Sequence, residues 1–343
     1  NVTKESVIRG QLIIDEGDPL NKLKLDKSIA KLKSTRIFSN VESSIVDGTT
    51  SDLKSINIVV EEQATGEISA GAGVGTNGGS FAFMVKENNF MGEGVKLDTR
   101  LDISATTVKG GVTYTDPNYK LSGNQLSYNL TSSTNDKKET SGYENKTIST
   151  SVGTSFEQYK NTYIKPSLTL SYDDLKVDNT ASDSTRKLAG NYTELLFDYG
   201  ISRDGRDKSF EPTSGSIFGF SQSIPLYSDA SYLRNTVSLS SYKAFSDDVV
   251  TSGKFYSSAV NGFSDDVRLS KRENLPRSKL RGFTVGKVGP RDGDDYVGGN
   301  YVAAANFEAK LPNILPEASK ADIGMFVDFA NIWGVDYSST VGE

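Results

Sequence analysis

Cysteine and histidine are absent from the 343 residues of this sequence. Without them the chain has neither a Ser-His-Asp or Cys-His catalytic arrangement nor the usual ligand set of a zinc site. An enzyme would have to work with carboxylate, lysine or serine groups alone, so we predict that the protein is not an enzyme and needs no cofactor. The formal net charge of −6 does not favour nucleic acid as a partner.

Long apolar runs are absent as well. No stretch reaches the roughly 18 to 20 residues of a membrane-spanning helix, and the mean hydropathy is −0.42. A β-barrel in a membrane remains possible, because only alternate residues of its strands face lipid. The chain starts at Asn1 without an initiator methionine or a leader, so we expect that processing or truncation removed its original start.

Residues 1–63 differ from the rest of the chain. They combine helical spacing of leucine and isoleucine among lysines with two later stretches of strand character. The expected segments are a helix capped by Thr3 that runs to about Leu12, a helix that opens at Asp18-Pro19, and strands at 37–45 and 53–61. This order predicts a small α+β module.

From about Gly66 onward helical periodicity gives way to extended segments separated by Gly, Asn, Asp and Ser. In the clearest segment Val95, Leu97 and Thr99 share one face, while Lys96 and Asp98 share the other. We count about thirteen such segments, near 67–75, 79–88, 93–104, 106–115, 123–133, 148–157, 162–172, 190–202, 214–225, 230–244, 248–263, 299–311 and 321–333. Residues 64–343 are therefore predicted to be mainly β and antiparallel.

Alternation does not say which face is the interior. A soluble β-sandwich buries the apolar face, whereas an outer-membrane barrel turns it towards lipid. The segments are long enough for tilted membrane strands, which need about 9 to 11 residues. Tyrosine and phenylalanine near strand ends, as at Phe90 and Tyr114, suit the aromatic girdles of a barrel.

Two local patterns suggest a ligand at first sight. Gly71-Ala72-Gly73-Val74-Gly75 resembles a phosphate loop, but no helical pattern follows it, so we predict a bend or a strand that pairs weakly. Asp292, Asp294 and Asp295 miss the spacing of a calcium-binding EF-hand loop and are predicted to be solvated. We therefore expect no metal site.

The long interruption at 264–298 contains Leu280-Arg281-Gly282-Phe283. This tetrapeptide resembles the (V/I)RGF signature of the loop that folds into the lumen of BamA-type insertases and related two-partner secretion transporters. Further turns of this chain are similar to turns of the same family, namely 88–94, 115–119 and 212–216. Residues 36–41 resemble the strand opening of the last periplasmic repeat, the POTRA module.

The resemblance implies an outer-membrane protein with a partial POTRA module at 1–63 in the periplasm and a transmembrane barrel at 64–343. A family barrel has sixteen strands, so about three are expected to be missing, and the chain is expected to be truncated at both ends. The implied activity is insertion and folding of β-barrel proteins, by strand addition to the module and by a lateral gate. Unfolded outer-membrane proteins, assembly lipoproteins and the bilayer are the implied partners.

Three other functions stay open at this point. A two-partner-secretion-type or autotransporter-assembly pore shares the same family features. A passive porin would lack the periplasmic module and the RGF loop. A soluble β-sandwich adhesin would bury its apolar face.

Within the family frame, we predict two sites, the first from glycine content and the second from strand parity. The glycines of 66–75, namely Gly71, Gly73 and Gly75, predict a gate strand that opens before other strand pairs. Glu308 and Asp328 lie opposite the apolar residues of their strands, so both are predicted to face the lumen. Arg281 is placed to bridge them as a latch, Gly282 to turn the chain, and Phe283 to anchor the loop tip.

Overall fold

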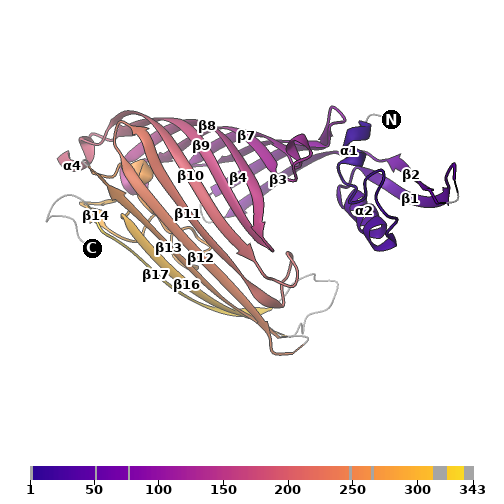
Figure 1. The fold of residues 1–343 in the computed structure, drawn as a ribbon. Coiled ribbons are helices and arrows are strands. Elements are labelled where there is room, and N and C mark those ends of the chain that lie inside the picture. The colour runs from indigo at the N-terminus through magenta and orange to yellow at the C-terminus, as the bar shows by residue number, and fades with distance from the viewer. Residues whose placement is uncertain are drawn as a thin grey trace. The chain divides into compact units, whose positions relative to one another are not determined.

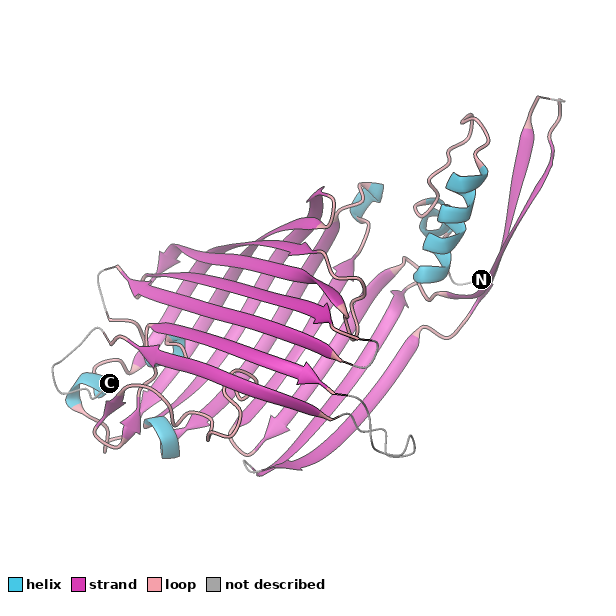
Figure 2. Ribbon diagram, turned by 90° about the horizontal axis from the view of Figure 1, so that it is seen from below, coloured by secondary structure: helices cyan, strands magenta, loops and turns pink. Residues whose placement is uncertain are grey.

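The structure, a computed structural model, describes residues 3–50, 52–75, 78–246, 249–263, 266–311 and 323–335. The chain divides into two compact units, residues 1–130 and 131–343. Strands make up most of both units and the helices are short (Figure 2). No helix among the described residues is long and apolar enough to cross a bilayer.

The first unit begins with the predicted order of two helices and two strands (Figure 1). These elements are α1 (Glu5–Arg9), α2 (Lys22–Ser34), β1 (Phe38–Asp47) and β2 (Lys54–Glu62). Leu32 of α2 packs on Ile37, Phe38 and Val41 to form a small apolar core. The helical and alternating patterns of the sequence therefore account for this module.

Both predicted helix starts are wrong. The residue that caps α1 is Lys4, without a side-chain hydrogen bond, because the hydroxyl of Thr3 accepts a hydrogen bond from Asn89 instead. The helix also ends at Arg9 rather than near Leu12. The second helix begins after Asn21, whose side chain accepts from the backbone N–H of Lys24 at 3.1 Å.

The remaining elements are strands joined by turns and short helices. In the first unit they are β3 (Gly66–Gly75), β4 (Gly78–Phe90), β5 (Val95–Ser104), β6 (Thr107–Asp116) and the 3-10 turn η1 (Tyr119–Leu121). β7 (Gln125–Lys137) follows, then α3 (Lys138–Ser141), β8 (Tyr143–Tyr159), β9 (Thr162–Val177), α4 (Asp183–Arg186), β10 (Gly190–Asp204), β11 (Ser214–Ser228), β12 (Tyr232–Ala244) and β13 (Val250–Gly262). The last are η2 (Leu269–Lys271), β14 (Arg291–Asp292), β15 (Asp295–Tyr296), β16 (Tyr301–Lys310) and β17 (Gly324–Trp333).

Thirteen of the described strands form one sheet, which confirms the number counted from the sequence. Their order is β17-β16-β13-β12-β11-β10-β9-β8-β7-β6-β5-β4-β3. Each strand therefore pairs with its neighbour in sequence, once β14 and β15 are set aside as a separate hairpin. Among the described residues β3 and β17 each have one hydrogen-bonded neighbour, so the sheet is open rather than a closed barrel.

Several strands of the second unit are longer than predicted. β8 extends from Tyr143 to Tyr159, beyond the expected 148–157. At its start Tyr143 packs with Leu175, Leu269 and Val297 in an apolar cluster that joins strands to the long loop. Packing against the loop orders strand ends that local periodicity does not mark.

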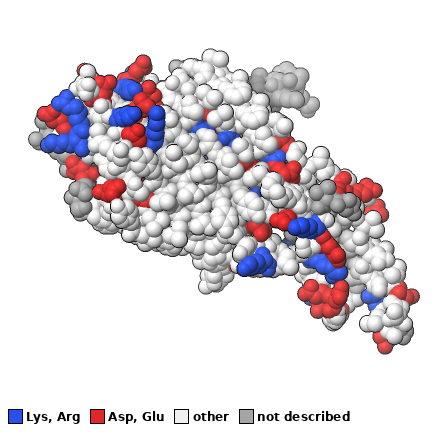
Figure 3. All heavy atoms as spheres, turned by 90° about the horizontal axis from the view of Figure 1, so that it is seen from above, with Lys and Arg blue, Asp and Glu red and all other residues white. Residues whose placement is uncertain are grey.

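The exposure of the strands is the reverse of that in a soluble protein. On β9 the side chains of Leu168, Leu170 and Tyr172 are exposed, whereas Ser171 and Asp173, which alternate with them, are buried. Figure 3 shows a broad outer area without charged side chains. A β-sandwich would bury the apolar face, so this arrangement contradicts the adhesin alternative and suits a surface that faces lipid.

The turn between β10 and β11 carries the Pro212–Ser216 motif. The carboxylate of Asp207 accepts hydrogen bonds from the Thr213 hydroxyl at 2.6 Å and from the backbone N–H groups of Thr213 and Ser214 at 3.0 and 3.1 Å. These bonds, first of all that from the Thr213 hydroxyl, lower the pKa of Asp207 to about 2. The motif therefore closes a turn around a carboxylate.

Acid is expected to open this turn. Because the folded-state pKa of Asp207 lies below its ordinary value, its contribution is complete above about pH 4 and is lost as the pH falls through about 2. Phe210, exposed on the same turn, should become cleavable by pepsin over that interval. The Asp207→Asn variant should be cleaved at a rate that does not change with pH there, and a flat wild-type profile would refute this role.

Candidate functional site

The connection between β13 and β16 folds back onto the sheet of the second unit. It contains η2 and the hairpin of β14 and β15, so the expectation of a segment without strand character is wrong for these four residues. Leu275 of this connection is buried with Val302, Ala304 and Ile332 of β16 and β17, and Leu280 packs against them. Apolar packing thus brings the predicted motif to the wall.

Arg281 contacts both of the carboxylates that parity assigns to the inner face. Its Nη1 donates to Glu308 Oε1 at 2.7 Å, and its Nε and Nη2 donate to the two Asp328 oxygens at 2.8 and 2.6 Å. The backbone N–H of Arg281 donates to Asp328 at 3.0 Å. These bonds, chiefly those to Asp328, raise the pKa of the guanidinium, which stays charged.

Three further side chains complete this site, and the sequence analysis missed them. Asn306, which is directly opposite Asp328 in the strand register, donates to Asp328 Oδ1 at 2.8 Å and to the carbonyl oxygen of Lys279 at 2.8 Å. The Arg281 guanidinium stacks 3.7 Å from the ring centre of Phe326. Lys254 pairs with Glu308 at 2.6 Å. The same parity that selected the carboxylates places Asn306 and Phe326 on their face.

The other motif residues behave differently from one another. Gly282 has a φ of +86°, which glycine adopts without strain, in keeping with the predicted turn. Phe283 does not anchor the loop tip, because 58% of its surface is exposed. Leu280 is the apolar contact of the motif instead.

A second attachment lies at the start of the loop, in residues Val267–Arg272, which we call the loop root. Arg268 Nη2 donates to Glu194 Oε2 of β10 at 2.5 Å, and both side chains are only 1% exposed. The Arg268 guanidinium also stacks 4.3 Å from the ring centre of Tyr192. A buried ion pair with a stacked cation therefore fixes the root to the sheet.

Neighbouring groups extend this attachment over several strands. Lys271 forms an ion pair with the same Glu194, and the Ser270 hydroxyl donates to Asp173 of β9. Arg234 of β12 donates to the backbone carbonyl of Lys271 at 2.5 Å. Nothing in the sequence pairs these residues, because the sheet and the loop path bring together positions 37 to 97 residues apart.

The predicted gate strand lies at one edge of the sheet in the first unit. Gly71 and Gly73 are opposite Ala82 and Ser80 of β4. A Cβ added to Gly71 would meet nothing within 4 Å, and one added to Gly73 would make ordinary contact with Ser80. The strand therefore has space on this face and little side-chain packing.

The prediction that the acidic residues of 292–295 are solvated holds for Asp294, which is exposed, but is wrong for Asp292, which is buried. Asp292 accepts hydrogen bonds from Ser182 and from Thr185, the latter at 3.2 Å. Burial, followed by the charges of Asp178, Asp292 and Asp294, raises the pKa of Asp295. Among the described residues no group of acidic side chains is arranged to hold a metal ion.

A family model described as the Omp85 superfamily domain matches residues 89–342. The outer membrane protein assembly factor BamA of Neisseria meningitidis serogroup B is 25% identical over 376 residues, which cover 97% of this chain and 45% of that protein. BamA of Nitratidesulfovibrio vulgaris is 24% identical, with 98% and 43% covered. The chain thus spans less than half the length of these curated relatives.

Solved structures share the fold. The crystal structure of BamA from Haemophilus ducreyi lacking POTRA domains 1–3 matches with a TM-score of 0.86 and 22% identity, covering 97% of this chain and 70% of that one. CdiB from Acinetobacter baumannii matches with a TM-score of 0.59 and 12% identity, covering 96% and 61%. The resemblance predicted from the turn motifs and the RGF loop is confirmed.

Proposed function

This chain belongs to the Omp85 superfamily, and from that premise we propose that it is part of an assembly factor that folds and inserts β-barrel proteins into the bacterial outer membrane. Similarity over nearly the whole chain to proteins named as assembly factors supports this proposal. The proposed clients are unfolded outer-membrane proteins, and lipoproteins of an assembly complex are the proposed partners. Residues 1–63 would form a POTRA module in the periplasm.

The observation that carries the proposal is the edge strand β3. Among the described residues it has one hydrogen-bonded neighbour, and six of its ten residues are glycine or alanine. An edge with unpaired backbone groups can accept another strand. Small side chains leave that backbone accessible, so β3 suits transient pairing with a client strand better than a bulky edge would.

The proposed mechanism needs no enzymatic step and no nucleotide. A client strand would add first to the module and then to β3, where pairing satisfies its backbone groups. Burial of the client's outward apolar side chains in lipid and closure of its own edges would drive release. The Arg281 latch, meaning Arg281 with Glu308 and Asp328, would hold β16 and β17 in place while β3 exchanges partners.

Substituting Gly71 and Gly73 with valine tests the gate. Each glycine destabilises a strand by about 0.5 to 1 kcal/mol through lost conformational entropy, and valine also adds packing on β4. The pairing of β3 with β4 should therefore be more stable in the double variant. We expect client-barrel insertion by the intact protein to slow by roughly 5- to 30-fold, the factor for 1 to 2 kcal/mol. Insertion is measured as the rate at which a client becomes heat-modifiable in liposomes.

The control is Gly110→Val on β6, a strand paired on both sides. A Cβ at this position makes ordinary contacts only, so the variant adds the same side chain away from the edge. It should insert clients at the wild-type rate. Equal rates for the edge variant and the control would remove β3 as the gate.

A further inference from the structure

Helix α1 packs on two turns of the sheet within the first unit. At its start, the backbone N–H of Lys4 donates to the carbonyl oxygen of Gly92, in the turn between β4 and β5, at 2.8 Å. At its end, the Asn118 side chain, in the turn between β6 and β7, donates to the carbonyl oxygen of Gly10 at 3.2 Å. Because the contacts lie at both ends of α1, they fix the direction of the helix on the sheet as well as its position.

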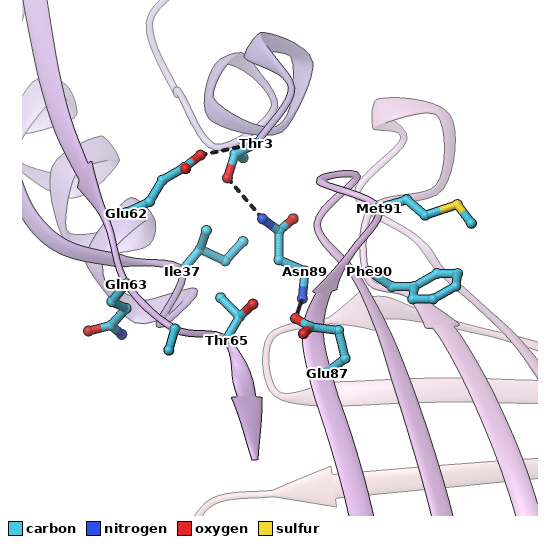
Figure 4. Close-up of a pocket in the computed structure, with 10 residues that line it drawn as sticks. Thr3, Ile37, Glu62, Gln63, Thr65, Glu87, Asn89, Phe90 and Met91 are labelled. Atoms are coloured by element: carbon cyan, nitrogen blue, oxygen red, sulfur yellow. Dashed lines mark hydrogen bonds between the residues drawn. The ribbon is translucent and has the colours of Figure 1, made fainter. Parts of the chain in front are cut away.

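Asn89 uses both the oxygen and the nitrogen of its amide at the first contact. Figure 4 shows the bond from the nitrogen to Thr3. Its side chain is buried. Its Oδ1 accepts from the backbone N–H of Gly94 at 2.8 Å, which closes the turn, and its Nδ2 donates to the Thr3 hydroxyl at 2.8 Å. The backbone N–H of Thr3 in turn donates to Glu62 at the end of β2, at 2.7 Å. One amide thus connects the sheet to the segment that leads into α1.

Close approach at the first turn depends on glycine. Gly94 has a φ of +71°, and a Cβ added there would lie 2.7 Å from Val7 Cγ1. Real Cβ atoms do not approach carbon so closely, and the short Val7 side chain has little freedom to move aside, so another residue at position 94 would displace α1. A Cβ added to Gly10 would lie 2.6 Å from Leu121 Cδ2, the flexible end of a side chain that can move away.

This contact is thin. Cavities of about 330 and 280 Å³ lie beside it, the first lined by Thr3, Ile37 and Asn89 among others and the second by Lys4, Val7 and Asn118 among others. Three residues, 63–65, separate β2 from β3. With so short a connection, the contacts of α1 with the two turns can set the angle between the module and the strands.

We infer that these two turns are a seat for α1 that fixes the angle of the N-terminal module on β3–β6, with Asn89 and Gly94 as positioning residues. The seat gives a role to residues 88–94 and 115–119, the turn motifs that strand exchange does not use. On the proposed assembly function, on which this step rests, the module would then present a client strand to β3 from one direction.

Distance measurement tests the seat directly. This chain has no cysteine, so two introduced cysteines can carry spin labels at chosen positions. We choose Lys31→Cys on α2 and Lys109→Cys on β6, both exposed. Pulsed electron paramagnetic resonance then measures the distance between the two labels, which changes with the angle of the module. The wild-type intact protein should give one narrow distance distribution. Gly94→Ala should broaden it, because the new Cβ displaces Val7, and Gly94→Ala with Val7→Ala should narrow it again.

Gly123→Ala is the matched control. Gly123 has a φ of +78° in the second turn, so alanine meets the same backbone strain, but its Cβ would contact nothing within 4 Å. This variant should keep the narrow distribution. If Gly94→Ala and Gly123→Ala give the same distribution, the seat is refuted.

A second pair of variants tests the amide. Thr3→Val removes the hydroxyl that accepts the hydrogen bond from Asn89, so it should broaden the distance distribution. Thr3→Ser keeps the hydroxyl and should not. In the variants with a broadened distance distribution, the rate of client insertion should fall several-fold, while the variant proteins themselves stay heat-modifiable. If these variants insert clients at the wild-type rate, the positioning role is refuted. If the proposed assembly function is wrong, the wild-type protein will not insert clients, but it will still give the narrow distance distribution.

Discussion

Replacing Glu194 with glutamine is expected to release the loop root from the sheet. The variant leaves the Arg268 guanidinium, which is 1% exposed, without its counter-charge. Breaking a buried pair by removing one partner costs about 3 to 5 kcal/mol. If cleavage follows the population of the open form, protease cutting within 266–300 of the intact protein should rise by roughly 100-fold or more.

Two variants serve as controls for this result. Asp102→Asn breaks the Arg100–Asp102 pair, whose side chains are 64% and 33% exposed, and should cost under about 1 kcal/mol. Glu194→Leu combined with Arg268→Met and Lys271→Met removes the carboxylate and both of its cationic partners, and should recover much of the protection, since apolar side chains need no counter-charge. Digestion of the Glu194→Gln and Asp102→Asn proteins at the same rate would show that the ion pair does not hold the loop.

Period-two alternation accounts for what the sequence could predict. It locates all thirteen strands of the sheet and places Glu308 and Asp328 on one face, because side-chain direction depends only on residue parity within a strand. Asn306 and Phe326 lie on the same face by the same parity, but they are uncharged, and charge pairing alone does not predict them as partners of Arg281 and Asp328. Their part in the site depends on register, which pairs Asn306 with Asp328 and Phe326 with Glu308.

The loop root could not be predicted in the same way. Arg268 and Glu194 are 74 residues apart, and neither alternation nor a local motif links them. Their contact requires the path of the whole loop across β10, which apolar packing of Leu269 with Tyr143 and Leu175 determines. Phe283 fails for a related reason, since an aromatic side chain in a motif indicates an anchor only where the fold supplies a pocket.

Removing Arg281 is expected to weaken the second attachment of the loop. Arg281→Ala leaves the Asp328 side chain, which is 3% exposed, without the two hydrogen bonds from the guanidinium. The bonds from the backbone N–H of residue 281 and from Asn306 stay. The guanidinium side chain is 29% exposed, so the cost should fall between that of a surface pair and a buried one, at about 2 to 3 kcal/mol. Protease cutting within 270–295 should then rise by roughly 30- to 150-fold.

Arg281→Lys separates charge from geometry. Lysine keeps the positive charge but lacks the planar fork that serves Asp328 and Glu308 together, and it loses the stacking on Phe326. We therefore expect it to recover less than half of the lost protection and of client insertion. Asp328→Asn should do more harm than Glu308→Gln, because Asp328 accepts three of the four hydrogen bonds that Arg281 donates. Phe283→Ala, in the same motif but exposed, should behave as wild type, and a lysine variant equal to wild type in both assays would show that charge alone holds the loop.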